Sequence, residues 1–231
     1  MIATDTKQRI LDVAEEMFAD RGFGGTSLRS IIAAAEVNLA AVHYHFGSKE
    51  ALLEAVIVRR LEPLNRERLK LLDECERRAG KSGPSVEQIL EALLAPPIRF
   101  IRTTPEGSLY GKLLGRMHSE PGELFTAIAK KHFVNVLHRF QTALRRALPG
   151  LPAEDFFWRL HFTIGAMAHT LARPDLLEIM SGGLCRSADA KTAIPQLIGF
   201  LSAGFRASVS RRARKPARPS RVGRNHSEKR S

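Results

Sequence analysis

The sequence of 231 residues predicts an all-α fold. Apolar residues recur every three or four positions in successive segments, for example at Leu52, Leu53, Val56, Ile57 and Leu61, which is the spacing of an amphipathic helix. No segment shows the alternation of apolar and polar residues that indicates strands, and no internal repeat is visible. With 44% hydrophobic residues, the chain is long enough for a small N-terminal domain and one larger helical domain.

Three short helices are expected at the N-terminus. The first ends at Gly22, because glycine commonly follows a helix, and the second begins after Thr26 or Ser27, which are helix-capping residue types. Only a few residues separate the second helix, LRSIIAAA, from the third, and this is the spacing of a helix-turn-helix. Four acidic residues are expected on the solvent side of the first helix: Asp12, Glu15, Glu16 and Asp20.

The stretch VNLAAVHYHFGSKEAL, residues 37–52, has the composition of a helix that reads the major groove of DNA. Val42 and Phe46 fall on one side for packing, while two alanines on the other side allow close approach to a flat surface. Histidine, tyrosine and lysine side chains there can bind phosphates and base edges. Expected at base edges or at the helix entry are Asn38, Leu39, Ala40, Ala41, His43 and Tyr44, and expected at phosphates are Ser27, Arg29, Tyr44, His45 and Lys49.

The segment GFGGTSLRSIIAAAEVNLAAVHYHFGSKEAL resembles the DNA-binding unit of the TetR/AcrR family of bacterial transcriptional regulators. The resemblance covers roughly residues 5–60, and YHFGSKEAL is its specific core. The family usually has glycine at the position of Glu36, where φ is often positive, and tyrosine at the position of His43. Neither departure breaks the pattern, and His43 is expected to alter which bases are read.

The resemblance implies an N-terminal three-helix DNA-binding domain with a helix-turn-helix over residues 1–50, followed by a C-terminal helical ligand-binding and dimerisation domain over 80–210. It also implies a homodimer that binds a double-stranded DNA operator. Two apolar helices rich in small residues, at about 154–172 and 188–207, are expected to pair across a twofold axis as a four-helix bundle. Burial in the core is the alternative for these two helices.

A fourth helix, at about 48–79, is expected to link the two domains. Ser48 can cap this helix, and Glu50 lies in its first turn, where the helix dipole favours an anion. Pro63 is expected to kink or divide the helix, and the pair at 96–97 to break or kink the next helical segment. TTPEG, residues 103–107, is expected to form a turn.

A ligand cavity is expected in the larger domain. Arg116 is the candidate for binding an acidic headgroup, with Arg99, Arg102 and His118 as neighbours, although ion-paired or solvated residues are the alternative. The linking segment, which includes RRLEPLNRERLKLLDE, is similar to that of the PsrA-like branch of the family, whose members respond to fatty acids or acyl-CoA. The expected lining, for which ordinary core packing is the alternative, is Phe100, Leu109, Leu113, Leu114, Met117, Phe133, Phe157 and Phe162.

The formal net charge of +12 is concentrated at the C-terminus. Residues 211–231 hold nine lysine and arginine residues against one glutamate, a composition typical of a basic disordered tail. Residues 1–50 hold five basic residues against seven acidic ones, so the case for DNA binding depends on the recognition stretch. The alternative function is a sequence-tolerant, architectural DNA-binding protein that uses the tail.

Motifs of common enzymes are absent: the sequence has no G-x-S-x-G, no P-loop and no dinucleotide fingerprint. The eight histidines and two cysteines lack metal-ligand spacing, so no cofactor and no metal site is expected, and an enzyme with an unrecognised site is a weak third option. No apolar run approaches the roughly 20 residues of a membrane span, and the N-terminus is unlike a signal peptide. We therefore expect a cytoplasmic, ligand-responsive repressor that is not bound to a membrane.

Overall fold

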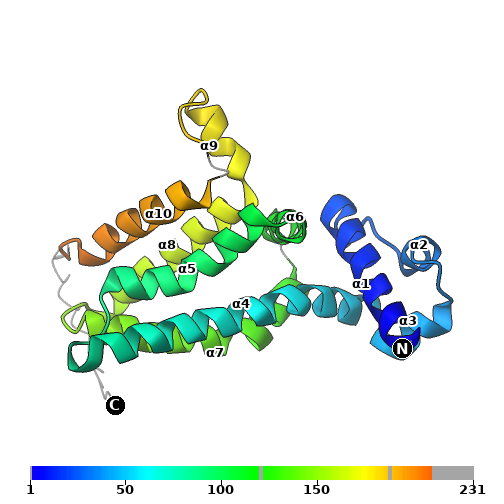
Figure 1. Cartoon of the computed structure of the whole chain (residues 1–231), viewed down its shortest axis with the longest axis horizontal. Coiled ribbons are helices and arrows are strands. Elements are labelled where there is room, and N and C mark those ends of the chain that lie inside the picture. The colour runs from blue at the N-terminus through cyan, green and yellow to red at the C-terminus, as the bar shows by residue number, and fades with distance from the viewer. Residues whose placement is uncertain (1, 120–121, 187–188, 210–231) are drawn as a thin grey trace, which may run out of the picture.

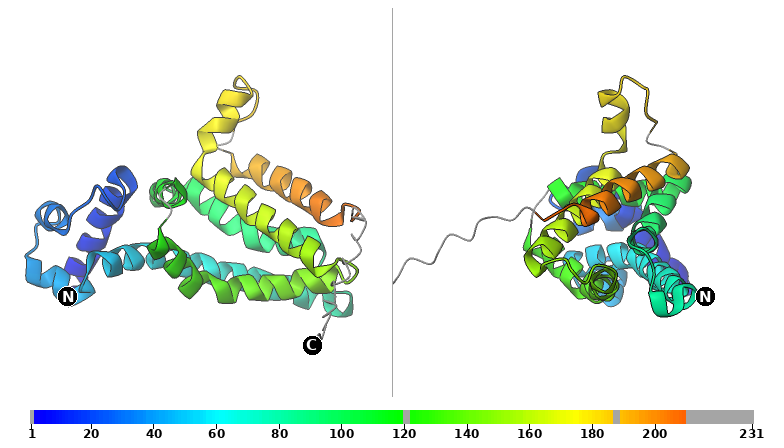
Figure 2. Two further views of the ribbon diagram at one scale, coloured as in Figure 1. Left: turned by 180° about the vertical axis from the view of Figure 1, so that it is seen from behind. Right: turned by 90° about the vertical axis from the view of Figure 1, so that its left-hand side faces the viewer.

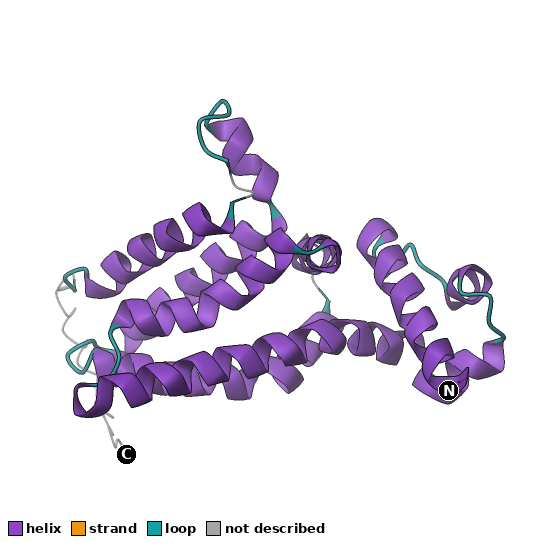
Figure 3. Cartoon of the chain, in the orientation of Figure 1, coloured by secondary structure: helices purple, strands orange, loops and turns teal. Residues whose placement is uncertain are grey.

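The computed structural model describes residues 2–119, 122–186 and 189–209, and every regular element in these ranges is a helix, which confirms the all-α prediction (Figure 3). A small N-terminal head, α1 to α3, is joined by the long α4 to a larger body made of the later helices (Figure 1). The helices are α1 (Ile2–Arg21), α2 (Leu28–Ala34), α3 (Leu39–Phe46), α4 (Lys49–Ala79), the 3₁₀ turn η1 (Gly80–Ser82), α5 (Val86–Thr103), α6 (Pro105–Ser119), α7 (Glu123–Ala147), α8 (Ala153–Ala172), α9 (Pro174–Met180) and α10 (Ala190–Arg206).

Local capping sets the boundaries of the helices in the head. The side chains of Ser27, Asn38 and Ser48 accept hydrogen bonds from backbone N–H groups three residues later, at 3.0, 2.8 and 3.1 Å, so the expected caps at Ser27 and Ser48 are confirmed. Glu36 has a φ of 52°, the left-handed conformation expected at this turn. For a residue other than glycine, this conformation is less favourable by on the order of 1 kcal/mol.

The head has a small core of its own. Ile10, Phe18, Ile31, Val42 and Leu52 have no exposed surface and join α1, α2, α3 and the start of α4. The buried hydroxyl of Thr26 donates to the carbonyl oxygens of Met17 and Gly22, at 3.1 and 2.8 Å, and this ties the loop before α2 to α1. The third helix is therefore fixed from behind, which leaves its outer face free.

A kink or a break was expected at the prolines, and neither helix is divided there. α4 runs without interruption over 31 residues through Pro63, whose ring is exposed. α5 likewise continues through Pro96 and Pro97, although both are buried. Pro97 lacks the N–H that would bind the carbonyl oxygen of Leu93 four residues earlier, but Nε of Arg68 donates to that oxygen at 2.9 Å. A side chain from α4 thus replaces the missing helical hydrogen bond.

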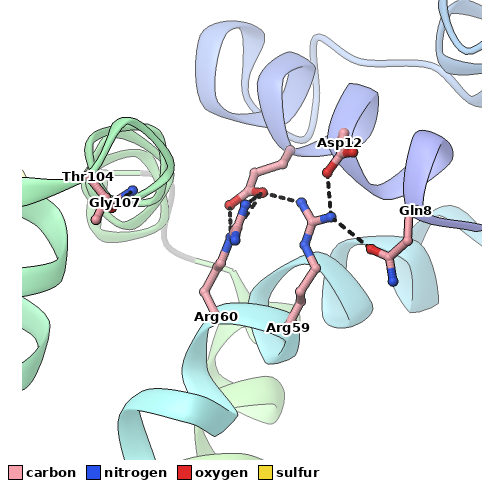
Figure 4. Close-up of polar contacts among 7 residues, drawn as sticks. Gln8, Asp12, Arg59, Arg60, Thr104 and Gly107 are labelled. Atoms are coloured by element: carbon pink, nitrogen blue, oxygen red, sulfur yellow. Dashed lines mark hydrogen bonds and ion pairs between the residues drawn. The ribbon is translucent and has the colours of Figure 1, made fainter.

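The turn expected at residues 103–107 reduces to a single residue, Thr104, between α5 and α6. The hydroxyl oxygen of Thr104 accepts a hydrogen bond from the backbone N–H of Gly107 at 2.9 Å, so it caps α6 (Figure 4). Proline suits the first helical position because no N–H is needed there. Pro105 therefore starts the helix instead of prolonging the turn.

The body packs α5 against α4, α6 and α10, with α7 and α8 completing the core. α9 and the loop after it project from the body as an arm, seen from three sides in Figures 1 and 2. None of the described helices is long and apolar enough to cross a membrane. The largest fully buried side chains of the body are Phe140, Phe156, Phe205, Leu72, Ile89 and Leu90.

Glu15 is not on the solvent side of α1, and that prediction is wrong: only 1% of its side chain is exposed. Nε and Nη2 of Arg60 donate to its two carboxylate oxygens at 3.0 and 2.8 Å, and Arg59 also binds it (Figure 4). Arg59 reaches Asp12 as well, at 2.6 Å. The helical pattern of α1 predicted an exposed carboxylate because the pattern contains no information about the two arginines of α4 that bind it.

We expect Glu15→Gln to lower the free energy of unfolding by about 2 to 4 kcal/mol, because it leaves two half-buried guanidinium groups without their shared counter-charge. Thermal and urea denaturation measure the change. Glu16→Gln, at an exposed position on the same helix, is the control and should stay within about 0.5 kcal/mol of the wild type. Equal effects of the two substitutions would show that the pairing with α4 contributes nothing.

Candidate nucleic-acid interface and ligand cavity

The third helix presents one buried and one exposed side. Val42 is fully buried against the head, whereas Leu39 is 54% and Tyr44 85% exposed. Ala40 and His43 are exposed as well. Small side chains beside an exposed aromatic ring make a surface that can approach a flat partner closely, as a helix in the major groove must.

The polar groups of this surface are held in place by local contacts. Nδ1 of His43 donates to the carbonyl oxygen of Gly47 at 2.9 Å, which leaves Nε2 for another group. The ring of Tyr44 meets that of His45 edge-on at 5.1 Å. Nζ of Lys49 lies 4.1 Å above the ring of Phe23, so a cation is positioned between the first turn of α4 and the loop after α1.

The remaining residues predicted to contact DNA flank α3. Arg29 is exposed on α2. Ser27 and Asn38 are also exposed, but their side-chain oxygens already cap helices, and the hydroxyl of Ser27 donates to Oγ of Ser30 at 3.0 Å. The amide NH₂ of Asn38 is therefore the donor left for a phosphate. All ten predicted residues therefore lie in one part of the chain, at the start of α2, along α3 or at the first residue of α4.

A second exposed surface consists of aromatic side chains on α8 and α10. Phe157, Trp158 and Phe162 on α8 are 52, 56 and 60% exposed, and Phe200 on α10 is 73% exposed. The rings of Trp158 and Phe162 stack with centroids 5.8 Å apart. Phe157 and Phe162 were expected to line the ligand cavity, and this is corrected: neither lines it, and more than half of each side chain is exposed.

The cavity lies between α4, α5, α6, α7 and α8 and has a volume of about 370 Å³. Leu114 and Phe133 line it as expected. Phe100, Leu109 and Leu113 pack in the surrounding core without lining it, and the side chains of Met117 and His118 lie outside the described residues. Apolar residues make up most of the lining: Ile57, Leu61, Leu64, Pro97, Leu114, Phe125, Ile128, Ala129, Phe133, Ile164, Met167, Ala168 and Leu171.

Arg116 does not border the cavity. Its Nε donates to the carbonyl oxygen of Ala19 at 2.6 Å and its Nη2 to that of Asp20, so it joins α6 to the end of α1. Arg99 pairs with Glu67 at 3.3 Å, and Arg102 donates to Thr170 at 3.3 Å. Burial lowers the pKa of Arg102. The prediction that Arg116 binds a headgroup in the cavity is therefore wrong.

The cation that does line the cavity is Arg68, which sequence reasoning missed. Its side chain belongs to α4 and is 3% exposed. A signal was present, because position 68 continues the apolar stripe of Leu61, Leu64 and Leu72, and a charged residue at such a position must be buried with partners or aimed into a cavity. Burial lowers the pKa of Arg68 to about 10, so the guanidinium is still protonated at neutral pH.

In the described part of the chain, no group of histidine, cysteine, aspartate and glutamate side chains could hold a metal ion. Cys75 is half-buried and Cys185 is exposed, and neither forms a disulfide. Burial raises the pKa of the Cys75 thiol, which makes it less reactive.

Two family models match the chain. One, described as "Bacterial regulatory proteins, tetR family", matches residues 10–56, and the other, "Tetracyclin repressor-like, C-terminal domain", matches residues 91–204. Among curated proteins, the chain is 38% identical over 56 residues to the transcriptional regulator UidR of Escherichia coli (24% of this chain) and 40% identical over 62 residues to SrpR of Pseudomonas putida (27% of this chain). The matched segments span 29% of the length of each of these relatives.

Solved structures share the fold over most of the chain. The transcriptional regulator FadR from Bacillus subtilis, in complex with stearoyl-CoA, has a TM-score of 0.64 at 14% identity, covering 85% of this chain and 98% of that protein. GusR from Salmonella enterica has a TM-score of 0.56 at 20% identity, covering 85% and 95%.

Proposed function

Because the chain belongs to the TetR family of bacterial regulatory proteins, we propose that it is a ligand-responsive repressor that binds a pseudo-palindromic operator as a homodimer. The observation that carries this proposal is the exposed face of α3, where Ala40, His43 and Tyr44 project from a helix whose other side is buried. The matched relatives are themselves named transcriptional regulators, in agreement with the expectation that the chain is not an enzyme.

Each part of the chain has a role in this proposal. Residues 1–50 bind DNA, and residues 80–210 form the dimer and bind the effector together with α4, which also links the head to the body. Residues 211–231 lie outside the described residues, and their charge adds non-specific affinity for DNA.

The ten residues predicted to contact DNA, here called the reading surface, form one group for base edges and one group for phosphates. His43, whose Nε2 is left for a partner, and Tyr44 face the bases beside the small side chains that allow close approach. Lys49, held over Phe23, binds a phosphate. The base-edge group is Ala40, Ala41, His43 and Tyr44, with Asn38 and Leu39 at the helix entry, and the phosphate group is Ser27, Arg29, Tyr44, His45 and Lys49.

The aromatic surface of α8 and α10 forms the dimer interface. Exposed Trp158, Phe162 and Phe200 make an apolar patch that a second copy would cover. The glycines at 165, 199 and 204 have open space where a side chain would project, so two helix pairs can approach closely there. Twofold pairing places two copies of α3 on successive major grooves, about 34 to 36 Å apart.

The effector is a small molecule that enters the cavity, and we propose a fatty acid or an acyl-CoA. The apolar lining suits an acyl chain. FadR, which has a similar fold, was crystallised with stearoyl-CoA, and this supports the same class of ligand here.

α6 is the element that connects the cavity to the head. Tyr110 and Leu114 on α6 line the cavity, while Arg116 on the same helix binds the carbonyl groups at the end of α1. A ligand that displaces α6 therefore also displaces α1. Its differential affinity for the two arrangements shifts the population away from the spacing that fits DNA.

The test of this function is the selection of bound sequences from random DNA, followed by competition binding at fixed salt. A regulator prefers the selected palindrome to random DNA by at least about 10³-fold. Little discrimination together with a steep salt dependence would instead identify a sequence-tolerant protein that relies on its basic tail.

In the reading surface, Tyr44→Ala and Lys49→Ala should each weaken operator binding about tenfold or more, because each removes a hydrogen bond to a phosphate. For Lys49→Ala, the salt dependence should also decrease by about one counterion per subunit. His43→Ala should instead reduce discrimination at one base pair by about 1 to 3 kcal/mol. Fluorescence anisotropy with the operator and with single-base variants measures all three.

Lys70→Ala is the matched control, since this exposed lysine lies about six turns further along α4 and should not affect DNA binding. If His43→Ala weakened binding to every DNA equally, His43 would not read bases.

For the dimer, Phe162→Glu should produce a folded monomer, because two or more charges would be buried in the apolar patch. Operator affinity should then fall at least about 100-fold. Val134→Glu places the same charge at a 49% exposed apolar position on α7 and should leave the dimer intact. Analytical ultracentrifugation distinguishes the species, and a stable Phe162→Glu dimer would exclude this interface.

For the coupling, Arg116→Ala should leave ligand affinity and operator affinity near their wild-type values and weaken the release of DNA by ligand severalfold, because the link from α6 to α1 is lost. Calorimetry measures ligand binding, and anisotropy measures release. If Arg116→Ala instead lost affinity for the ligand, Arg116 would bind the ligand headgroup and would not act only through α1.

A further inference from the structure

Arg68 is a buried cation without a counter-charge. Nε donates to the carbonyl oxygen of Leu93 and Nη1 to Oδ1 of Asn65, both at 2.9 Å. Nη2 has only the thioether sulfur of Met167, at 3.8 Å, and a thioether is a weak acceptor. Among the described residues no carboxylate lies within ion-pairing distance, since the adjacent Glu67 points to the exposed Arg99. An uncompensated charge in this position costs several kcal/mol.

The guanidinium group is nevertheless held in a fixed orientation. Nδ2 of Asn65 donates to the carbonyl oxygen of His132 at 3.1 Å, and this directs Oδ1 of Asn65 toward Arg68. The ring of Phe133 lies 5.2 Å from the guanidinium carbon. Contacts from α4, α5 and α7 thus position the group from three sides, while Nη2 remains for a partner in the cavity.

Among the described residues that line the cavity, Arg68 is the one with a formal charge. The other lining residues are apolar except Tyr110 and Thr126. One fixed cation at the wall of an apolar space is complementary to a molecule with one anionic group and an apolar remainder. A neutral apolar molecule would leave the guanidinium unpaired.

The size of the cavity limits the ligand further. Its volume of about 370 Å³ is near the lower end of the roughly 300 to 1,000 Å³ that is usual for small-molecule sites, which favours a small ligand. Coenzyme A thioesters are neutral at the acyl end and carry several negative charges on the nucleotide. The part of the lining that the structure describes offers no second cation for these charges. A free carboxylate of medium length matches both the charge and the volume.

We infer that the effector is a medium-chain carboxylic acid in its free form, and that Arg68 binds its carboxylate while the chain fills the cavity. This inference rests on the proposed function and specifies its ligand. In the bound state the carboxylate supplies the missing counter-charge, so ligand binding removes a cost that the free protein pays.

Calorimetry with decanoate, decanol and decanoyl-CoA tests the inference directly on the full-length wild-type protein. Decanoate should bind at least about tenfold more tightly than decanol, because only the acid forms a charge-assisted pair with Arg68. Decanoyl-CoA should bind more weakly than decanoate. The wild-type comparison does not depend on the folding of any variant.

Arg68→Met should weaken decanoate binding by roughly 10- to 100-fold and leave decanol binding unchanged. The substitution removes an unpaired buried charge but also the donor to the carbonyl oxygen of Leu93, so the melting temperature without ligand serves only to show that the variant is folded. A purely structural arginine would leave the preference for acid over alcohol intact. Arg99→Met, at an exposed arginine, is the control and should bind decanoate as the wild type does.

Three results would overturn the inference: equal affinities for decanoate and decanol, unchanged decanoate affinity in Arg68→Met, or no binding of any carboxylate from octanoate to hexadecanoate. Operator selection is measured separately on the same preparations. A protein that selects a palindrome yet fails these tests remains a regulator with a different effector, whereas failure to select any DNA would refute the proposed function itself.

Discussion

The geometry of the whole chain depends on the buried carboxylate of Glu15. Two arginines of α4 satisfy it, so α1 cannot separate from α4 without leaving charges unpaired inside the protein. α3 packs on α1 and leads directly into α4, which means that the exposed face of α3 has one fixed direction relative to the long helix.

The helices were predictable because their signals are local. Ser27 and Ser48 can be recognised as caps from the few residues that follow them, and Val42 as an inward position from helical periodicity alone. The left-handed conformation of Glu36 followed from its position in the turn. The residues expected to contact DNA lie within one short segment, so a correct register for α3 was enough to group them.

The cavity was less predictable because its residues come from five helices. Composition identifies Phe133 and Phe162 as large apolar residues. Only the packing of α7 and α8 decides that Phe133 lines the cavity and that Phe162 is exposed on an outer face. The same limit applies to cations. Arg68 and Arg116 both have apolar neighbours in the sequence, which therefore does not distinguish their surroundings. Arg116 reaches the backbone of α1, whereas Arg68 is enclosed, and each position depends on a contact with a helix distant in the chain.

The hydrogen bond between Arg68 and the carbonyl group of Leu93 exists because Pro97 leaves that carbonyl without its helical donor. The effects of substitutions at positions 68 and 97 are therefore coupled. An apolar residue at 68 would leave the carbonyl oxygen of Leu93 without a donor, and a residue with an N–H at 97 would compete with the arginine for the same acceptor. Under the proposed function, a neutral effector would remove the need for the guanidinium group, and a residue with an N–H at position 97 could then restore the donor to the carbonyl oxygen of Leu93.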